Sequence, residues 1–183
     1  MHQTNSFDKS TDQHHWLVVD AIRMPDIEEQ AYKHEPYPEL LKLFSGSHFE
    51  HLIDISPVVF NFSGSKELVE LLTNDFAMRT SSVIFTFDEQ KNEEERFKHL
   101  QNLLTVTIEN NITFFRYYSS EFWSNVSSAL TITDKSTILG PFNSLTWVDE
   151  KLNWQKITKN NDIQDPIKKD AITLNSPVFS RLA

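Results

Sequence analysis

The chain has 183 residues, no cysteine and a formal net charge of -9. A chain of this length can bury a full hydrophobic core without disulfides or metals, and the lack of cysteine excludes disulfides, thiolate zinc sites and a cysteine nucleophile. Residues 1–91 carry 7 Lys and Arg against 15 Asp and Glu, whereas residues 92–183 carry 10 against 11. The acidic first half would repel phosphate backbones, so nucleic acid is not expected as a partner.

The first half of the sequence predicts strands that alternate with helices. Residues 1–14 are polar, unlike a secretory signal, and are expected to form a flexible arm. The β-branched run in "HWLVVDAI", residues 15–22, is typical of a buried strand. After it we expect short helical segments over 26–35 and 36–44, a strand over 52–62 with Pro57 at its start or edge, and a helix over 66–75 capped by Ser65.

The second half continues this alternation and then changes to short strands. In chain order we expect a strand over 81–88, a long helix over 92–111, a strand over 112–118, a helix capped by Ser119 or Ser120, and closing strands within 136–142, 144–150 and 153–157. Residues 158–183 are expected to form a variable tail. No apolar run is long enough to cross a bilayer, so we predict a cytoplasmic protein without membrane insertion.

Together these elements predict an α/β or α+β fold. A mixed β-sheet would pack with several helices and close with short antiparallel strands. We place one domain at residues 15–157, which could consist of two lobes.

Few residues suggest metal binding. "SHFEH" puts His48 and His51 three residues apart, with Asp54 as a third candidate ligand, but the spacing is not the HExxH of metalloproteases. A solvated helix end explains these side chains more simply, and His14-His15 is interpreted in the same way. We therefore predict no metal and no cofactor.

Asp20 is placed where α/β proteins often bind ligands, at the end of a buried strand. A helix cap or an ion pair with Arg23 would explain it as well, and we favour that interpretation. An α/β enzyme that uses Asp20 with His48 or His51 stays open as an alternative.

The stretch "FFRYYSSEFW", residues 114–123, places one arginine among six aromatic rings. In a strand, Phe114, Arg116 and Tyr118 would point to one face, and the two rings between them to the other. RNA-binding sheets also interleave rings with arginine, but their glycines and basic surroundings are missing here. We expect Arg116 to be held by neighbouring rings or a carboxylate and to organise the central sheet.

The order of the sequence blocks resembles a known family, the effector-chaperone (adaptor) domains of bacterial type VI secretion. The resemblance covers residues 15–157 and rests on "WLVVDAIRMP", "LIDISPVVFNF", "SKELVELL", "HLQNLL", "FFRYYSSEFWSNV" and "ILGPFNSLTWVDE". The pieces "FRYY" and "GPF…W" are the most specific. Two positions depart from the family pattern: Ser119-Ser120 replaces an Asp-Pro, and Gln101 stands where an arginine often follows "HL".

The resemblance implies a non-catalytic cytoplasmic adaptor. Such a protein binds a toxin effector, through the effector's N-terminal region, and helps load it onto the VgrG spike protein. A structural component of a larger assembly, without a client, is a further alternative. We expect the client to contact Arg116 and exposed aromatic side chains, namely Tyr117, Trp123 and Trp147. Structural roles are expected for Phe114, Tyr118, Gly140 and Pro141.

Overall fold

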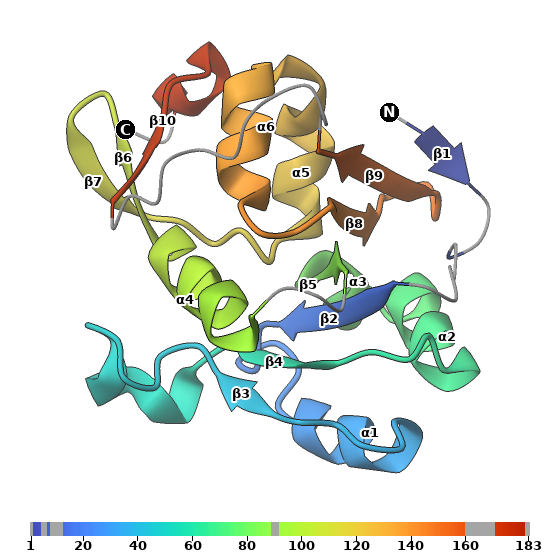
Figure 1. Ribbon diagram of the computed structural model, residues 1–183. Helices are drawn as coiled ribbons and strands as arrows, with labels where there is room; N and C mark the ends of the chain where they lie inside the picture. Colours follow the sequence, from blue (N-terminus) through green and yellow to red (C-terminus); the bar gives the residue numbers. More distant parts are fainter. Residues whose placement is uncertain (1, 5–6, 8–12, 89–91, 160–170, 182–183) are drawn as a thin grey trace.

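The computed structural model describes residues 2–4, 7, 13–88, 92–159 and 171–181. Its main sheet has the strand order β1-β9-β8-β5-β2-β4-β3, and every neighbouring pair is antiparallel (Figure 1). These strands are β1 (His2–Thr4), β2 (His14–Val19), β3 (Leu41–Lys42), β4 (Val58–Asn61), β5 (Ser82–Phe87), β8 (Ser144–Val148) and β9 (Trp154–Thr158).

A second sheet of three strands lies beside the main sheet. It consists of β6 (Thr105–Ile108), β7 (Asn111–Phe114) and β10 (Ile172–Leu174). Strands β6 and β7 form an antiparallel hairpin, whereas β10 runs parallel to β6. This sheet is therefore mixed, and β7 forms one of its edges.

The helices pack on both faces of the main sheet. They are α1 (Ile27–His34), α2 (Lys66–Asn74), α3 (Phe76–Thr80), α4 (Glu93–Leu103), α5 (Ser120–Val126) and α6 (Ile132–Leu139), with the 3₁₀ segments η1 (Glu50–Ile55), η2 (Ser127–Ala129) and η3 (Pro177–Arg181). None of the helices in the described part of the chain is long and apolar enough to cross a membrane.

Strand β2 shows how the core is divided. Trp16 and Val18 join the apolar cluster that includes side chains of α4, α5, α6 and the small sheet. Leu17 and Val19, which point to the other face, join the cluster with side chains of α1, α2 and α3. Both faces of this central strand are covered, which explains its continuous apolar sequence.

The fold class predicted from the sequence is confirmed, since helices pack against an antiparallel main sheet and a second, mixed sheet. Of the expected arm, residues 2–4 pair with β9, whereas residues 1, 5–6 and 8–12 lie outside the described residues. Of the expected tail, 160–170 and 182–183 lie outside them too, but residues 172–174 pair with β6, and Phe179 is fully buried. The described part of the tail thus belongs to the folded core.

The helix expected over residues 92–111 is wrong in its second half. Helix α4 ends at Leu103, and residues 105–108 form β6. The reason is the β-branched run Thr-Val-Thr-Ile, which favours a strand. Glu109 and Asn110 then take positive φ angles of 49° and 68°, as a tight hairpin turn requires, and lead into β7.

Four shorter predictions also need correction. The strand expected over 52–62 is shorter, because residues 52–55 lie in the 3₁₀ segment η1 and only residues 58–61 form β4. The strand expected over 112–118 ends at Phe114, so residues 115–119 form a linker to α5. Residues 136–139 lie in α6 instead of a strand, because Thr131 caps this helix by accepting a hydrogen bond from the Asp134 amide at 3.1 Å. Residues 36–44 form no helix and contain only the two-residue strand β3.

Candidate functional site

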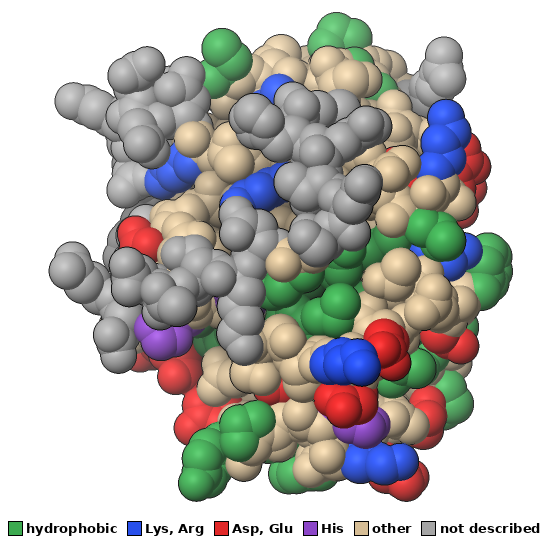
Figure 2. All heavy atoms as spheres, turned by 90° about the vertical axis from the view of Figure 1, so that its right-hand side faces the viewer, with side chains coloured by type: hydrophobic (Ala, Val, Ile, Leu, Met, Phe, Trp, Pro, Cys, Tyr) green, Lys and Arg blue, Asp and Glu red, His purple; other side chains and the backbone are tan. Residues whose placement is uncertain are grey.

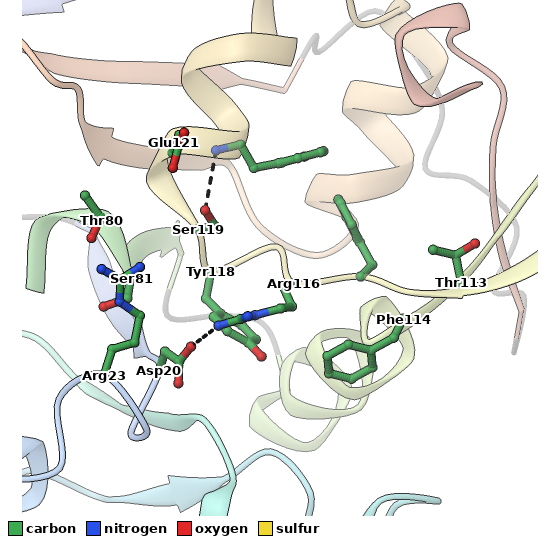
Figure 3. A pocket seen from close by; sticks show the side chains of 12 residues that line it. Asp20, Arg23, Thr80, Ser81, Thr113, Phe114, Arg116, Tyr118, Ser119 and Glu121 are labelled. Atoms are coloured by element: carbon green, nitrogen blue, oxygen red, sulfur yellow. Dashed lines mark hydrogen bonds and ion pairs between the residues drawn. The ribbon is translucent and has the colours of Figure 1, made fainter. Parts of the chain in front are cut away.

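A hollow of about 480 Å³ opens where the end of β2, the end of α3 and the linker from β7 to α5 meet (Figure 3). Its charged lining residues are Asp20, Arg23, Arg116 and Glu121. The apolar and aromatic part comes from Phe114, Phe115, Tyr118 and Phe122, and the rest from Thr80, Ser81, Thr113 and Ser119. The hollow thus combines both charge signs with an aromatic wall.

An ion pair between Asp20 and Arg116 spans this hollow. The Asp20 side chain is only 3% exposed, whereas that of Arg116 is 56% exposed. The second carboxylate oxygen of Asp20 accepts a hydrogen bond from the Ile22 amide at 3.0 Å. The carboxylate is fixed at the end of a central strand, and the guanidinium keeps a large surface toward solvent.

The expectation that rings or a carboxylate hold Arg116 is confirmed. Asp20 binds it, and its guanidinium carbon lies 5.8 Å from the centre of the Tyr118 ring. Of the two favoured interpretations of Asp20, a helix cap or an ion pair with Arg23, the second is wrong, because Asp20 pairs with Arg116. Arg116 follows β7 in the linker, so it holds the small sheet to the main sheet and is not itself part of a strand.

The electrostatics of this group keep Arg116 charged and Tyr118 neutral. Burial by itself lowers the pKa of Arg116, but the hydrogen bond to Asp20 and the nearby charges raise this pKa above its usual value. Burial, and then the Asp20 carboxylate, raise the pKa of Tyr118 to about 12. The hollow therefore offers a permanent cation beside a protonated phenol at neutral pH.

Three aromatic residues expected to be exposed are in fact buried. Tyr117 and Trp123 are 0% exposed and Trp147 is 1% exposed. Their polar atoms bond inside the protein: the Tyr117 hydroxyl donates to the Leu100 carbonyl at 3.0 Å, and Trp123 Nε1 donates to the Tyr117 carbonyl at 2.5 Å. Their size and satisfied polar groups make them core residues, so they present no surface to a partner in this conformation.

The residues expected to have structural roles fall into two groups. Tyr118 is 4% exposed, whereas Phe114 is 42% exposed and lies at the rim of the hollow. Gly140 ends α6 with a φ of +50°, and a Cβ on it would lie 2.3 Å from Cε1 of His99. Gly140 is therefore required by the close approach of a ring, and the half-buried Pro141 follows it in the turn to β8.

The two departures from the family pattern have clear roles in the fold. Ser119 caps α5, with its hydroxyl oxygen accepting from the Phe122 amide at 3.4 Å, as predicted. Ser120 is buried in the first turn of that helix. Gln101 donates from Nε2 to the carbonyls of Leu43 and Ser45, at 3.1 and 2.6 Å, and so ties α4 to the turn after β3.

The histidines are not brought to the hollow. His48 and His51 are exposed, at or beside η1, and do not line the hollow that contains Asp20. Within the described residues, no group of three or more His, Cys, Asp or Glu side chains could hold a metal ion. His14 is exposed, but His15 is buried, with its Nδ1 3.0 Å from the Thr86 hydroxyl oxygen. The interpretation of His15 as solvated is wrong.

The sequence analysis missed the opposite wall of the hollow. Arg23 follows Asp20 and lies 5.9 Å from the centre of the Phe76 ring, and Thr80 and Ser81 close the wall at the end of α3. Phe76 begins α3 and is 65% exposed. In the sequence Phe76 lies far from Arg23, so no local pattern indicated this wall.

Comparison with known families gives one match. The family described as "Domain of unknown function (DUF4123)" matches residues 15–136. The chain belongs to this family. The DUF4123 match begins with β2 and ends inside α6, so it contains the ion pair, the hollow and the β6–β7 hairpin. No curated protein and no solved structure matches the chain.

Proposed function

We propose that this DUF4123 protein is an adaptor of a bacterial type VI secretion system. It binds a toxin effector in the cytoplasm, keeps it folded and helps load it onto the VgrG spike protein. The role is non-catalytic and needs no cofactor. The family membership and the ordered resemblance of blocks from "WLVVDAIRMP" to "GPFNSLTWVDE" support this function.

The observation that carries the proposal is the form of the hollow. An open site that joins the exposed Phe114 ring and the half-buried Phe122 ring to a half-exposed arginine suits the capture of another polypeptide. An enzyme that uses Asp20 with His48 or His51 has less support, because the histidines lie outside this site.

Co-purification tests the proposal. The tagged chain is expressed together with the toxin encoded beside it, and with the N-terminal region of that toxin alone. We expect a stable complex with both, and a complex of the adaptor, the toxin and VgrG when all three are expressed. The proposal is wrong if both proteins are folded and the toxin does not co-purify. Homo-oligomers without toxin binding would instead favour a structural assembly component.

A further inference from the structure

We propose that the free edge of β7 binds one extended segment of the client, and that a carboxylate of this segment binds Arg116 and Arg23. This inference rests on the proposed function and names the surface and the chemistry of the client. Three features carry it: the hydrogen-bonding pattern of β7, its apolar side chains, and the arginines that follow it.

The pairing of the hairpin shows which backbone groups are free. Asn111 pairs with Ile108 across the two-residue turn, and the Phe115 amide donates to the Leu104 carbonyl at 2.9 Å. Because hydrogen-bonded positions alternate along an antiparallel strand, the backbone groups of Ile112 and Phe114 point away from β6. No strand of the described part of the chain pairs with that side of β7, which lies on the outside of the small sheet (Figure 1).

The side chains of the same two residues make this edge apolar. Ile112 is 79% exposed and Phe114 is 42% exposed. The Phe49 ring packs on Phe114, with 5.1 Å between ring centres, and extends the apolar surface. Proteins usually protect an exposed edge with charged residues or proline, and β7 has neither between residues 111 and 114. The edge is therefore suited to accept another strand.

The edge leads directly into the arginines of the hollow. Thr113, Phe114 and Arg116 line the hollow together, and Figure 3 shows Arg116 between Phe114 and Asp20. Arg116 has one carboxylate partner and remains 56% exposed. Arg23 forms no ion pair with any described residue. Glu121 also lines the hollow, but among the described residues only Asp20 forms an ion pair with one of its arginines. Both guanidiniums therefore keep donors for a carboxylate from outside.

The charges favour a client segment with one carboxylate, placed at Arg23 and Arg116, over a second copy of this chain. The chain carries a net charge of -9, and Figure 2 shows acidic side chains spread over the lower half of another face, where Figure 1 places α1 and α2. Two copies would repel each other at low salt. A client segment with apolar residues at alternate positions and an acidic residue beyond them would match both the edge and the arginines.

Paired variants test this surface through binding of the toxin's N-terminal region. Ile112→Lys places a charge on the edge of β7, and Arg23→Glu reverses the charge at an arginine that forms no ion pair with any described residue. Ile132→Lys changes an isoleucine that is 55% exposed on α6, and Lys98→Glu makes the same charge change on the exposed face of α4. We expect the first two to weaken binding at least about tenfold, as centrally placed interface residues do, and both controls to bind like the unmodified chain.

Hydrogen exchange provides an independent readout at the strand. The amides of Ile112 and Phe114 should exchange more slowly in the complex, and the melting temperature of all four variants should stay close to that of the unmodified chain. If the unmodified chain and Ile112→Lys bind the toxin region equally, the edge is not the site, although the adaptor function stands. If Ile112→Lys instead abolishes self-association of the chain alone, its occupant is a second copy and the inference is wrong. A folded chain that binds no toxin overturns the proposed function itself.

Discussion

Gly140 should tolerate no side chain, and the structure gives both reasons. Its φ of +50° and ψ of -116° lie in a region that other residues rarely adopt, which costs about 1–3 kcal/mol. An added Cβ would also lie 2.3 Å from Cε1 and 2.6 Å from both ring nitrogens of His99. His99 is held by the Ile138 carbonyl, 2.9 Å from its Nε2, so its ring cannot simply turn away.

Forcing the ring aside adds an overpacking cost of about 1–3 kcal/mol to the backbone cost. Gly140→Ala should therefore lower the free energy of unfolding by about 2–6 kcal/mol. For a domain of this size the melting temperature should fall by about 5–20 °C. Urea unfolding followed by circular dichroism measures the free energy, and calorimetry measures the melting temperature.

Gly46 provides a matched control. Its φ is +65°, but no atom lies within 4 Å of an added Cβ. Gly46→Ala should cost only the backbone term, roughly 1–2 kcal/mol. In a His99→Ala background Gly140→Ala should also become less harmful, because the ring is gone. Equal costs at the two glycines, or an unchanged cost without the His99 ring, would refute the reasoning.

Three further predictions concern buried polar groups. Burial lowers the pKa of His99 from 6.5 to about 4. The free energy of unfolding should therefore be highest above pH 6.5 and should fall by about 3 kcal/mol at most as the pH drops to 4. Denaturation at several pH values should show this dependence, and it should be weaker in His99→Asn. Arg116→Ala leaves the Asp20 carboxylate buried and should cost about 1–3 kcal/mol, whereas Asp20→Asn with Arg116→Ala should cost less than the sum of the single changes. Ser176→Ala removes a hydroxyl that donates to Asp134 at 2.5 Å. The free energy of unfolding should fall by about 1–3 kcal/mol, and limited proteolysis should release residues 171–181 more readily. The first prediction is wrong if His99→Asn leaves the pH dependence of stability unchanged. The second is wrong if the costs of Asp20→Asn and Arg116→Ala simply add, and the third if Ser176→Ala leaves proteolysis unchanged.

The sequence predicted best those elements that local patterns determine. The run "WLVV" became the central strand β2, "SVIFTF" became β5, and Ser119 caps α5. In each case the local preference and the burial in the fold agree. The β-branched or aromatic runs favour strands, and the serine oxygen satisfies an amide at a helix start wherever that helix packs.

The helix that was predicted too long shows why other elements were missed. Phe97, Leu100, Leu104 and Ile108 keep a helical spacing, although the last of them lies in β6. All four pack against or within the same apolar cluster. Burial of the same residues is compatible with a helix or with a turn into a strand, so periodicity alone could not decide.

The candidate site could not be predicted from the sequence for a different reason. Asp20 and Arg116 are 96 residues apart in the sequence, and only the packing of the two sheets brings them together. The expectation that a carboxylate holds Arg116 was correct, but its partner could not be chosen among 26 acidic residues. The exposure of individual rings was equally hidden: Phe114 is at the surface and Tyr117 is in the core, within one short block.

The ion pair connects the stability of the fold to the proposed binding surface. Asp20 directly follows β2 of the main sheet, and Arg116 lies in the linker that follows β7 of the small sheet. The contact therefore fixes the free edge of β7 relative to the main sheet, while 56% of the Arg116 side chain stays exposed. A client carboxylate that shares Arg116 would meet an arginine already held in place, which reduces the ordering cost of binding. Loss of Asp20 should thus weaken client binding even though Asp20 itself is buried and cannot touch the client.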